Sequence, residues 1–198
     1  LYTPMIENFE MKFTYEEACE LMYKALAPMG EDYLAIVREG INNRWVDVYE
    51  NSGKRSGAYS AGGYGMHPVI LMNFQGTLND VFTLVHEMGH SIHTYLSCHN
   101  QPSCYSDYVI FVAEVASTCN EALLMQYLLD HAKDKKERAY LLNHFLEQFR
   151  ATLYRQCMFA EFELKVGELN AAGQGITADA LCEIYCKLNE DYFGEGIV

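Results

Sequence analysis

The segment Val85–His90 contains two histidines at the spacing of a metal site. It reads VHEMGH and matches the pattern HExxH, with His86 and His90 four positions apart. Residues four apart lie on one face of an α-helix, so both imidazoles can reach one ion. Glu87 lies beside that ion rather than on it, which suits a general base that activates water. The pattern predicts a hydrolytic metal centre; the alternative is a solvated helix face with two incidental histidines.

A carboxylate 24 positions after His90 is the candidate third ligand. Glu114 is the single charged residue in the segment Tyr108–Ala116, a composition that predicts a helix buried on most sides. A buried, unpaired carboxylate is costly, and residues 56–132 contain no Lys or Arg, so a distant cation is the alternative partner. Two histidines and one carboxylate leave a tetrahedral position for water, which is typical of catalytic zinc. We therefore expect one Zn²⁺ per chain, held by His86, His90 and Glu114.

Further polar residues lie close to these ligands in the sequence. His93 shares the His90 face, but it lies ~10.5 Å along the helix from His86, too far for both to bind one ion. We expect His93 to line the cleft or support a ligand. Three residues follow Glu114 on its own helix face: Ser117, Thr118 and Glu121. Any of them could orient a ligand, and for Glu121 an ordinary carboxylate at the edge of the core is an equal alternative.

Helix and turn signals predict a mainly α fold with a small β-hairpin or sheet beside the active-site helix. Thr77 begins a Thr-x-x-Asp helix start, so we expect a helix from there to about Leu96, carrying HExxH. Other helices are expected in residues 14–49 (two, interrupted at Pro28–Gly30), 106–131, 134–169 and 177–193. The run Val69–Phe74 is a strand candidate, and residues 56–60 could pair with it across a glycine-rich loop. We thus divide the chain into a helical lead-in (1–50), a glycine-rich hairpin (51–76), the zinc-site helices (77–131) and C-terminal helices (132–198).

Composition excludes several classes of protein and partner. The net charge of −13 argues against nucleic acid as a partner, and no apolar stretch is long enough to cross a bilayer, so we expect no membrane contact. The seven cysteines form no CxxC pair and no disulfide framework, which predicts a reducing, cytoplasmic setting. The sequence begins at Leu1 without a signal peptide, so we expect a processed protein or a piece of a longer one.

The sequence resembles the thimet-oligopeptidase superfamily, and specifically its bacterial oligoendopeptidase F branch. Four segments carry the resemblance: Ser56–Tyr59, Phe74–Leu78, His86–His93 and Phe111–Glu121. It implies a zincin-like helical core, zinc at the three ligands named above, Glu87 as the base, and a deep channel for short peptides. It also implies that the strand over Val69–Phe74 flanks the cleft, where a peptide substrate could pair with it by β-strand addition.

The function expected from these residues is zinc-dependent hydrolysis of internal bonds in short peptides. The alternatives are a related HExxH carboxypeptidase and a catalytically dead, zinc-binding helical module. Members of the resembled family are much longer and carry, after this core, a His and a Tyr that stabilise the oxyanion. We therefore expect this chain alone to be a weak or inactive peptidase that self-associates through exposed apolar surface. Tyr64 and His67 are the alternative oxyanion contacts within it.

Overall fold

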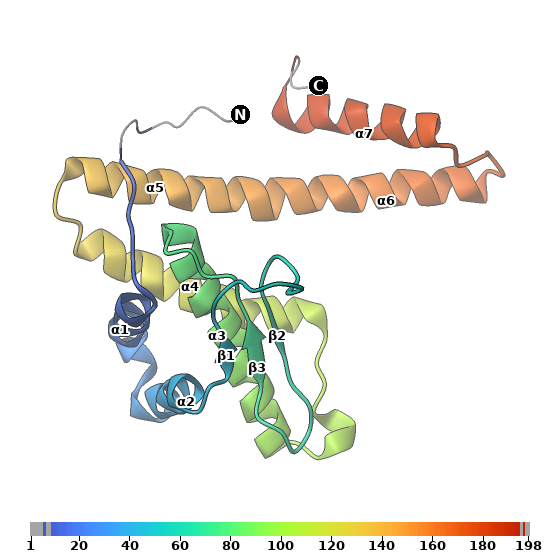
Figure 1. The fold of residues 1–198 in the computed structure, drawn as a ribbon. Coiled ribbons are helices and arrows are strands. Elements are labelled where there is room, and N and C mark those ends of the chain that lie inside the picture. Colours follow the sequence, from blue (N-terminus) through green and yellow to red (C-terminus); the bar gives the residue numbers. More distant parts are fainter. Residues whose placement is uncertain (1–5, 7–8, 195, 197–198) are drawn as a thin grey trace. The chain divides into compact units, whose positions relative to one another are not determined.

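The protein is described by a computed structural model over residues 6, 9–194 and 196 (Figure 1). Leu1 and Val198, the outer ends of the predicted helical lead-in and C-terminal helices, lie outside the described residues. The chain divides into two compact units, Asn8–Asp134 and Lys135–Val198, with Leu1–Glu7 assigned to the second. All the candidate site residues belong to the first unit.

Helices make up most of the first unit. Its elements are α1 (Tyr15–Ala25), the 3₁₀ turn η1 (Ala27–Met29), α2 (Glu31–Asn42), α3 (Leu78–Asn100), the 3₁₀ turn η2 (Ser103–Tyr105) and α4 (Ile110–Asp130). α3 begins with a capping box in which the Thr77 hydroxyl accepts from the Asp80 N–H and the Asp80 carboxylate accepts from the Thr77 N–H. The predicted helix start at Thr77 is confirmed, and α3 carries HExxH in its interior.

A three-stranded sheet packs beside α3. Its strands are β1 (Val46–Asp47), β2 (Tyr59–Ala61) and β3 (Val69–Leu71), in the order β1-β3-β2. β2 runs antiparallel to β3, which confirms the predicted hairpin, and β1 runs parallel to β3 on its other side. β1 was not predicted. Because β3 (Val69–Leu71) is paired on both sides, the expectation that a peptide adds to this strand is wrong, and the two edges of the sheet are β1 and β2 (Figure 1).

The core of the first unit lies between these helices and the sheet. Side chains from α1, α3, α4, β3 and the turn before β1 are fully buried there, including Met22, Trp45, Ile70, Leu84, Met88 and Leu124. α3 is buried along most of its length, so its two histidines occupy a rigid support. Burial of this apolar surface contributes ~25 cal/mol per Å², which makes the core the main force holding α3 in place.

The second unit is built from long helices. α5 (Lys135–Phe149) continues through a π-helical turn, η3 (Arg150–Tyr154), into α6 (Arg155–Ala171), and α7 (Ala178–Phe193) returns along α6 (Figure 1). The predicted long helix over 134–169 and the final helix capped by Thr177 are confirmed. No helix in the part of the chain that the structure describes is both long and apolar enough to span a membrane.

Candidate metal centre

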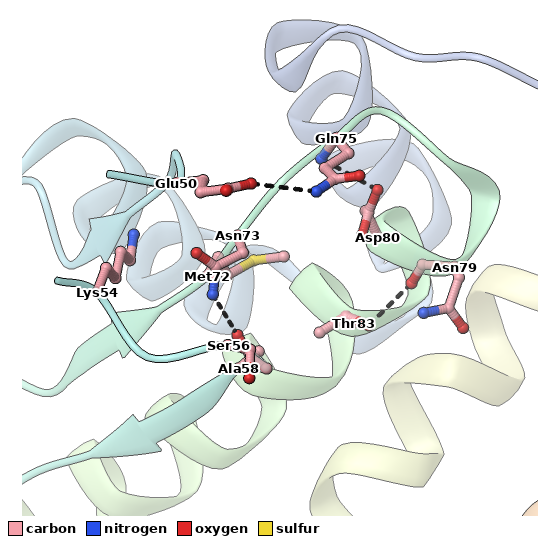
Figure 2. Close-up of a pocket in the computed structure, with 11 residues that line it drawn as sticks. Glu50, Lys54, Ser56, Ala58, Met72, Asn73, Gln75, Asn79, Asp80 and Thr83 are labelled. Carbon is pink, nitrogen blue, oxygen red and sulfur yellow. Dashed lines mark hydrogen bonds between the residues drawn. The ribbon is translucent and has the colours of Figure 1, made fainter. Parts of the chain in front are cut away.

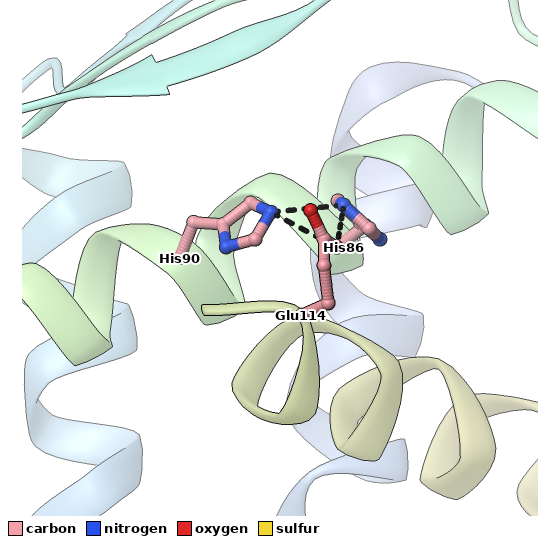
Figure 3. Close-up of side chains that lie close together, drawn as sticks. All are labelled: His86, His90 and Glu114. Atoms are coloured by element: carbon pink, nitrogen blue, oxygen red, sulfur yellow. Dashed lines mark hydrogen bonds and ion pairs between the residues drawn. The ribbon is translucent and has the colours of Figure 1, made fainter. Parts of the chain in front are cut away.

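Two neighbouring helices bring His86, His90 and Glu114 together (Figure 3). The histidines lie one turn apart on α3, and Glu114 comes from the second turn of α4. The two histidine Nε2 atoms are 3.0 Å apart, and Glu114 Oε2 lies 3.5 Å from Nε2 of His86 and 3.6 Å from Nε2 of His90. Three potential ligand atoms therefore form a small triangle.

The size of this triangle fits a tetrahedral metal ion. Zinc binds imidazole nitrogen and carboxylate oxygen at about 2.0–2.2 Å, so neighbouring ligand atoms in a tetrahedron are separated by about 3.3–3.6 Å. The two separations that involve Glu114 lie within that range, and the separation of the two Nε2 atoms is about 0.3 Å shorter. A zinc-sized ion could be held by His86, His90 and Glu114 with little rearrangement, and one tetrahedral position would remain open.

Two further side chains orient these groups. The Glu121 carboxylate is hydrogen-bonded to Nδ1 of His86, which leaves the His86 Nε2 lone pair facing Glu114. The Ser117 hydroxyl, which is fully buried, donates to Oε2 of Glu114 at 3.0 Å. Thr118 instead donates to the backbone carbonyl of Glu114 and touches no ligand atom. Of the three residues that could orient a ligand, the structure thus places two against ligands.

Burial and close charges shift the pKa values of the group. Burial raises the pKa of Glu87, and nearby Glu114 adds to the rise although His86 opposes it. Burial by itself lowers the pKa of His86, but the hydrogen bond and charge of Glu121 outweigh it and raise the pKa overall. Burial and the neighbouring His86 lower the pKa of His90. Perturbed pKa values of this kind concentrate at functional sites.

The edge strand β2 is fixed to α3 directly beside the candidate base. Glu87 is only 7% exposed, and the Ser60 backbone lies close enough to its carboxylate to oppose the rise in its pKa. The Ser60 hydroxyl lies 2.7 Å from the hydroxyl of Ser91, one helical turn after Glu87. The strand edge therefore lies next to the Glu87 carboxylate.

Other residues considered from the sequence lie outside the triangle. His93 is not part of the metal group, and its ring stacks on Tyr108 at a centroid distance of 3.8 Å. The His67 ring stacks on Trp45, with Nδ1 2.7 Å from the Pro68 carbonyl oxygen. Tyr64 is half exposed. None of these contacts assigns an oxyanion role to Tyr64 or His67.

The N-terminal half of α4 differs from the prediction. It was expected to be buried on most sides, but the Glu114 side chain is 49% exposed and Phe111 is 80% exposed. Together with Val109, Ile110, Val112 and Val115, Phe111 forms an exposed surface, here called the apolar face of α4. The apolar residues lie all round this segment, which is why burial on most sides was predicted. Within the described residues only one side of the segment packs against α3, so the prediction was wrong for the other sides.

A hollow in the surface lies away from these residues. It has a volume of about 410 Å³ and lies between the loop after β1, the end of β3 and the first turns of α3 (Figure 2). None of the three candidate ligands lines it. Two of its polar side chains hold the loop in place: Gln75 donates to Glu50, and Asn73 donates to the carbonyls of Arg55 and Gly57. These contacts give the hollow a structural explanation.

Known proteins identify the family. The model for peptidase family M3 matches residues 1–198. The chain belongs to peptidase family M3. It is 56% identical over 198 residues to oligopeptidase PepF of Bacillus subtilis and 50% identical over 194 residues to the chromosomal oligoendopeptidase F of Lactococcus lactis subsp. cremoris. Those matches cover 100% and 98% of the chain but only 30% and 32% of the relatives, so the chain spans about a third of their length.

A solved structure supports the fold. The crystal structure of a putative peptidase from Chlamydophila abortus matches 96% of the chain and 32% of its own chain, with a TM-score of 0.75 and 42% sequence identity. The fold of this chain is therefore also found in a solved structure that is 42% identical to it. The predicted resemblance to oligoendopeptidase F and the predicted mainly α fold are both confirmed.

Proposed function

We propose that these residues are the catalytic core of a zinc-dependent metalloendopeptidase that hydrolyses internal bonds of short peptides. The observation that carries the proposal is the triangle of His86, His90 and Glu114, which has the size of a tetrahedral site. Membership of peptidase family M3 supports a metallopeptidase. Because the chain spans about a third of its relatives' length, we propose that it works as part of a longer protein.

The side chains divide the work of hydrolysis between them. When bound, zinc would polarise the scissile carbonyl and lower the pKa of a water. Glu87 would take the proton of that water and pass it to the leaving amine. Its low exposure supports this role, since burial raises the pKa of its carboxyl and makes transient protonation less costly. Glu121 and Ser117 would hold His86 and Glu114 in their orientations.

The peptide would lie along β2. β2 is an outer strand of the sheet, and its Ser60 contacts Glu87 and Ser91 on the active-site helix. Backbone groups on an open strand edge can pair with an extended peptide, which supplies affinity without sequence preference. This geometry would present a scissile bond beside Glu87, and it replaces the predicted pairing with β3.

The relatives that the chain matches favour internal over C-terminal cleavage. They are described as oligopeptidase PepF and oligoendopeptidase F, and an endopeptidase cleaves internal bonds. These matches support an oligopeptidase that cleaves internal bonds.

Cleavage of a peptide with both termini blocked tests the proposal. The full-length protein loaded with zinc should cleave such a peptide internally, and removal of the metal by a chelator should abolish the activity until zinc is restored. A protein that cleaves only peptides with a free C-terminal carboxylate would be a carboxypeptidase. A protein that binds zinc but cleaves neither substrate would be a zinc-binding module.

We also propose that the 198-residue chain by itself is weakly active and self-associates. An oxyanion donor contributes roughly a hundred- to a thousandfold in rate, and the oxyanion His and Tyr are expected beyond these residues. The apolar face of α4 is a contiguous exposed surface of the kind that drives association. Light scattering should show concentration-dependent oligomers that Phe111→Glu reduces; unchanged monomers at high concentration would contradict this. We further propose a cytoplasmic location.

A further inference from the structure

A buried amide links the two helices that carry the candidate ligands. Asn120 on α4 has no exposed surface. Its Nδ2 donates to the backbone carbonyl of Val85 at 3.3 Å, and its Oδ1 accepts from the Tyr33 hydroxyl at 2.9 Å. We propose that Asn120 is a positioning residue, which fixes the distance between α3 and α4 and so holds Glu114 within reach of the histidines. The inference rests on the proposed function and adds a residue to it.

The backbone carbonyl that accepts from Asn120 lies next to the candidate metal ligands. Val85 immediately precedes His86, and in an α-helix its carbonyl already accepts from the N–H of Gly89. A carbonyl oxygen has a second lone pair, which the Asn120 amide occupies. The α4 side chain therefore holds the very turn of α3 that presents the first candidate ligand. It does so from a position six residues after Glu114.

Gly89 makes this close approach possible. A Cβ at Gly89 would lie 2.8 Å from the Ser117 Cα, 3.0 Å from the Ala116 carbonyl oxygen and 3.1 Å from Asn120 Nδ2. Two of those atoms belong to the backbone and cannot rotate away. The backbones of α3 and α4 thus approach closely between His86 and His90, and the Asn120 amide lies beside that contact.

Tyr33 fixes the amide from the other side. It lies on α2, so its hydroxyl ties a third helix to the contact between α3 and α4. With its oxygen held by Tyr33, the Asn120 amide has a single orientation in which its N–H groups face Val85. A site of this kind must hold its side chains within about 0.5 Å of the binding geometry. A buried, doubly bonded amide at the helix contact can supply that accuracy.

The alternative is that Asn120 contributes only to stability, and a matched variant separates the two. Leu124, one turn later on α4, is also fully buried, and its hydrocarbon side chain cannot hydrogen-bond to a ligand. Asn120→Ala and Leu124→Ala should both lower the melting temperature of the full-length protein. Zinc affinity, measured by competition with a chromophoric chelator at a temperature where both variants are folded, should then differ. Residues that hydrogen-bond a metal ligand directly are worth about 10- to 100-fold in affinity. Asn120 instead holds the backbone next to His86, so we expect a loss at the lower end, about tenfold, for Asn120→Ala and less than threefold for Leu124→Ala.

A milder variant guards against misfolding. Tyr33→Phe keeps the ring and removes one of the two hydrogen bonds of Asn120, so zinc affinity should fall by at least threefold. The melting temperature should fall less than in Asn120→Ala, because only one hydrogen bond is lost and no cavity forms. Unchanged zinc affinity in Asn120→Ala or Tyr33→Phe, or an equal loss in Leu124→Ala, would overturn the positioning role. Failure of the unsubstituted protein to bind zinc would instead refute the proposed function on which that role depends.

Discussion

Adding a methyl group at Gly89 tests the contact between α3 and α4. In an open helix, Gly→Ala stabilises by ~0.5–1 kcal/mol, because alanine loses less conformational entropy on folding. At Gly89 the new Cβ would lie 2.8 Å from one backbone atom and 3.0 Å from another. Overpacking of this kind costs ~1–3 kcal/mol, and contact with backbone puts the cost in the upper half of that range. The cost of overpacking exceeds the gain in helix propensity, so we expect a net destabilisation of ~1–2 kcal/mol.

Gly167 provides the matched control. It lies inside α6, and a Cβ there would meet nothing within 4 Å. In a chain of this size each kcal/mol moves the melting temperature by ~2–4 °C. Thermal unfolding followed by circular dichroism should therefore show a lower melting temperature for Gly89→Ala and an equal or higher one for Gly167→Ala. A Gly89→Ala variant as stable as the Gly167→Ala variant would refute the close helix contact.

Three further outcomes follow from the site and the core. Glu121→Ala should weaken zinc affinity by about 10- to 100-fold, since the histidine that it orients would lose its partner; affinity within twofold of the original would exclude that role. Glu87→Gln in the full-length protein should keep zinc and lose peptide hydrolysis by several orders of magnitude, because an amide cannot act as the base; near-normal turnover would assign the base elsewhere. Burial raises the pKa of the Cys19 thiol to about 11, so at pH 8 iodoacetamide should label exposed Cys104 far faster, as measured by mass spectrometry. Equal labelling rates would mean that Cys19 is accessible.

Local signals in the sequence were sufficient to select the residues of the candidate site. The spacing of His86 and His90 and the cap at Thr77 are properties of one helix, and such short-range patterns can be interpreted without knowing the fold. Glu114 was selected because it is the single charge among apolar residues. The burial inferred from that pattern was wrong for the exposed side of α4. The pattern predicted a helix here correctly, but it contained no information on which side of the helix would be covered.

Features that depend on distant contacts could not be predicted in this way. β1 consists of two residues, Val46 and Asp47, which become a strand through pairing with β3, 24 positions away. The bond between Tyr33 and Asn120 joins residues 87 apart, and neither neighbourhood marks the other as its partner. Ser117 contacts Glu114 whereas Glu121 contacts His86. This difference likewise depends on how α3 and α4 cross, which the sequence does not reveal.

The zinc content of the full-length protein and of its Glu114→Ala variant tests the central claim most directly. A ligand set of two histidines and one carboxylate predicts about one zinc per chain by elemental analysis. Glu114→Ala should lose most of that metal, whereas His93→Ala should retain it, because His93 stands outside the metal group. One zinc per chain in the unsubstituted protein, its loss in Glu114→Ala and its retention in His93→Ala would support the site. Full zinc occupancy in Glu114→Ala, or no zinc in the unsubstituted protein, would contradict it.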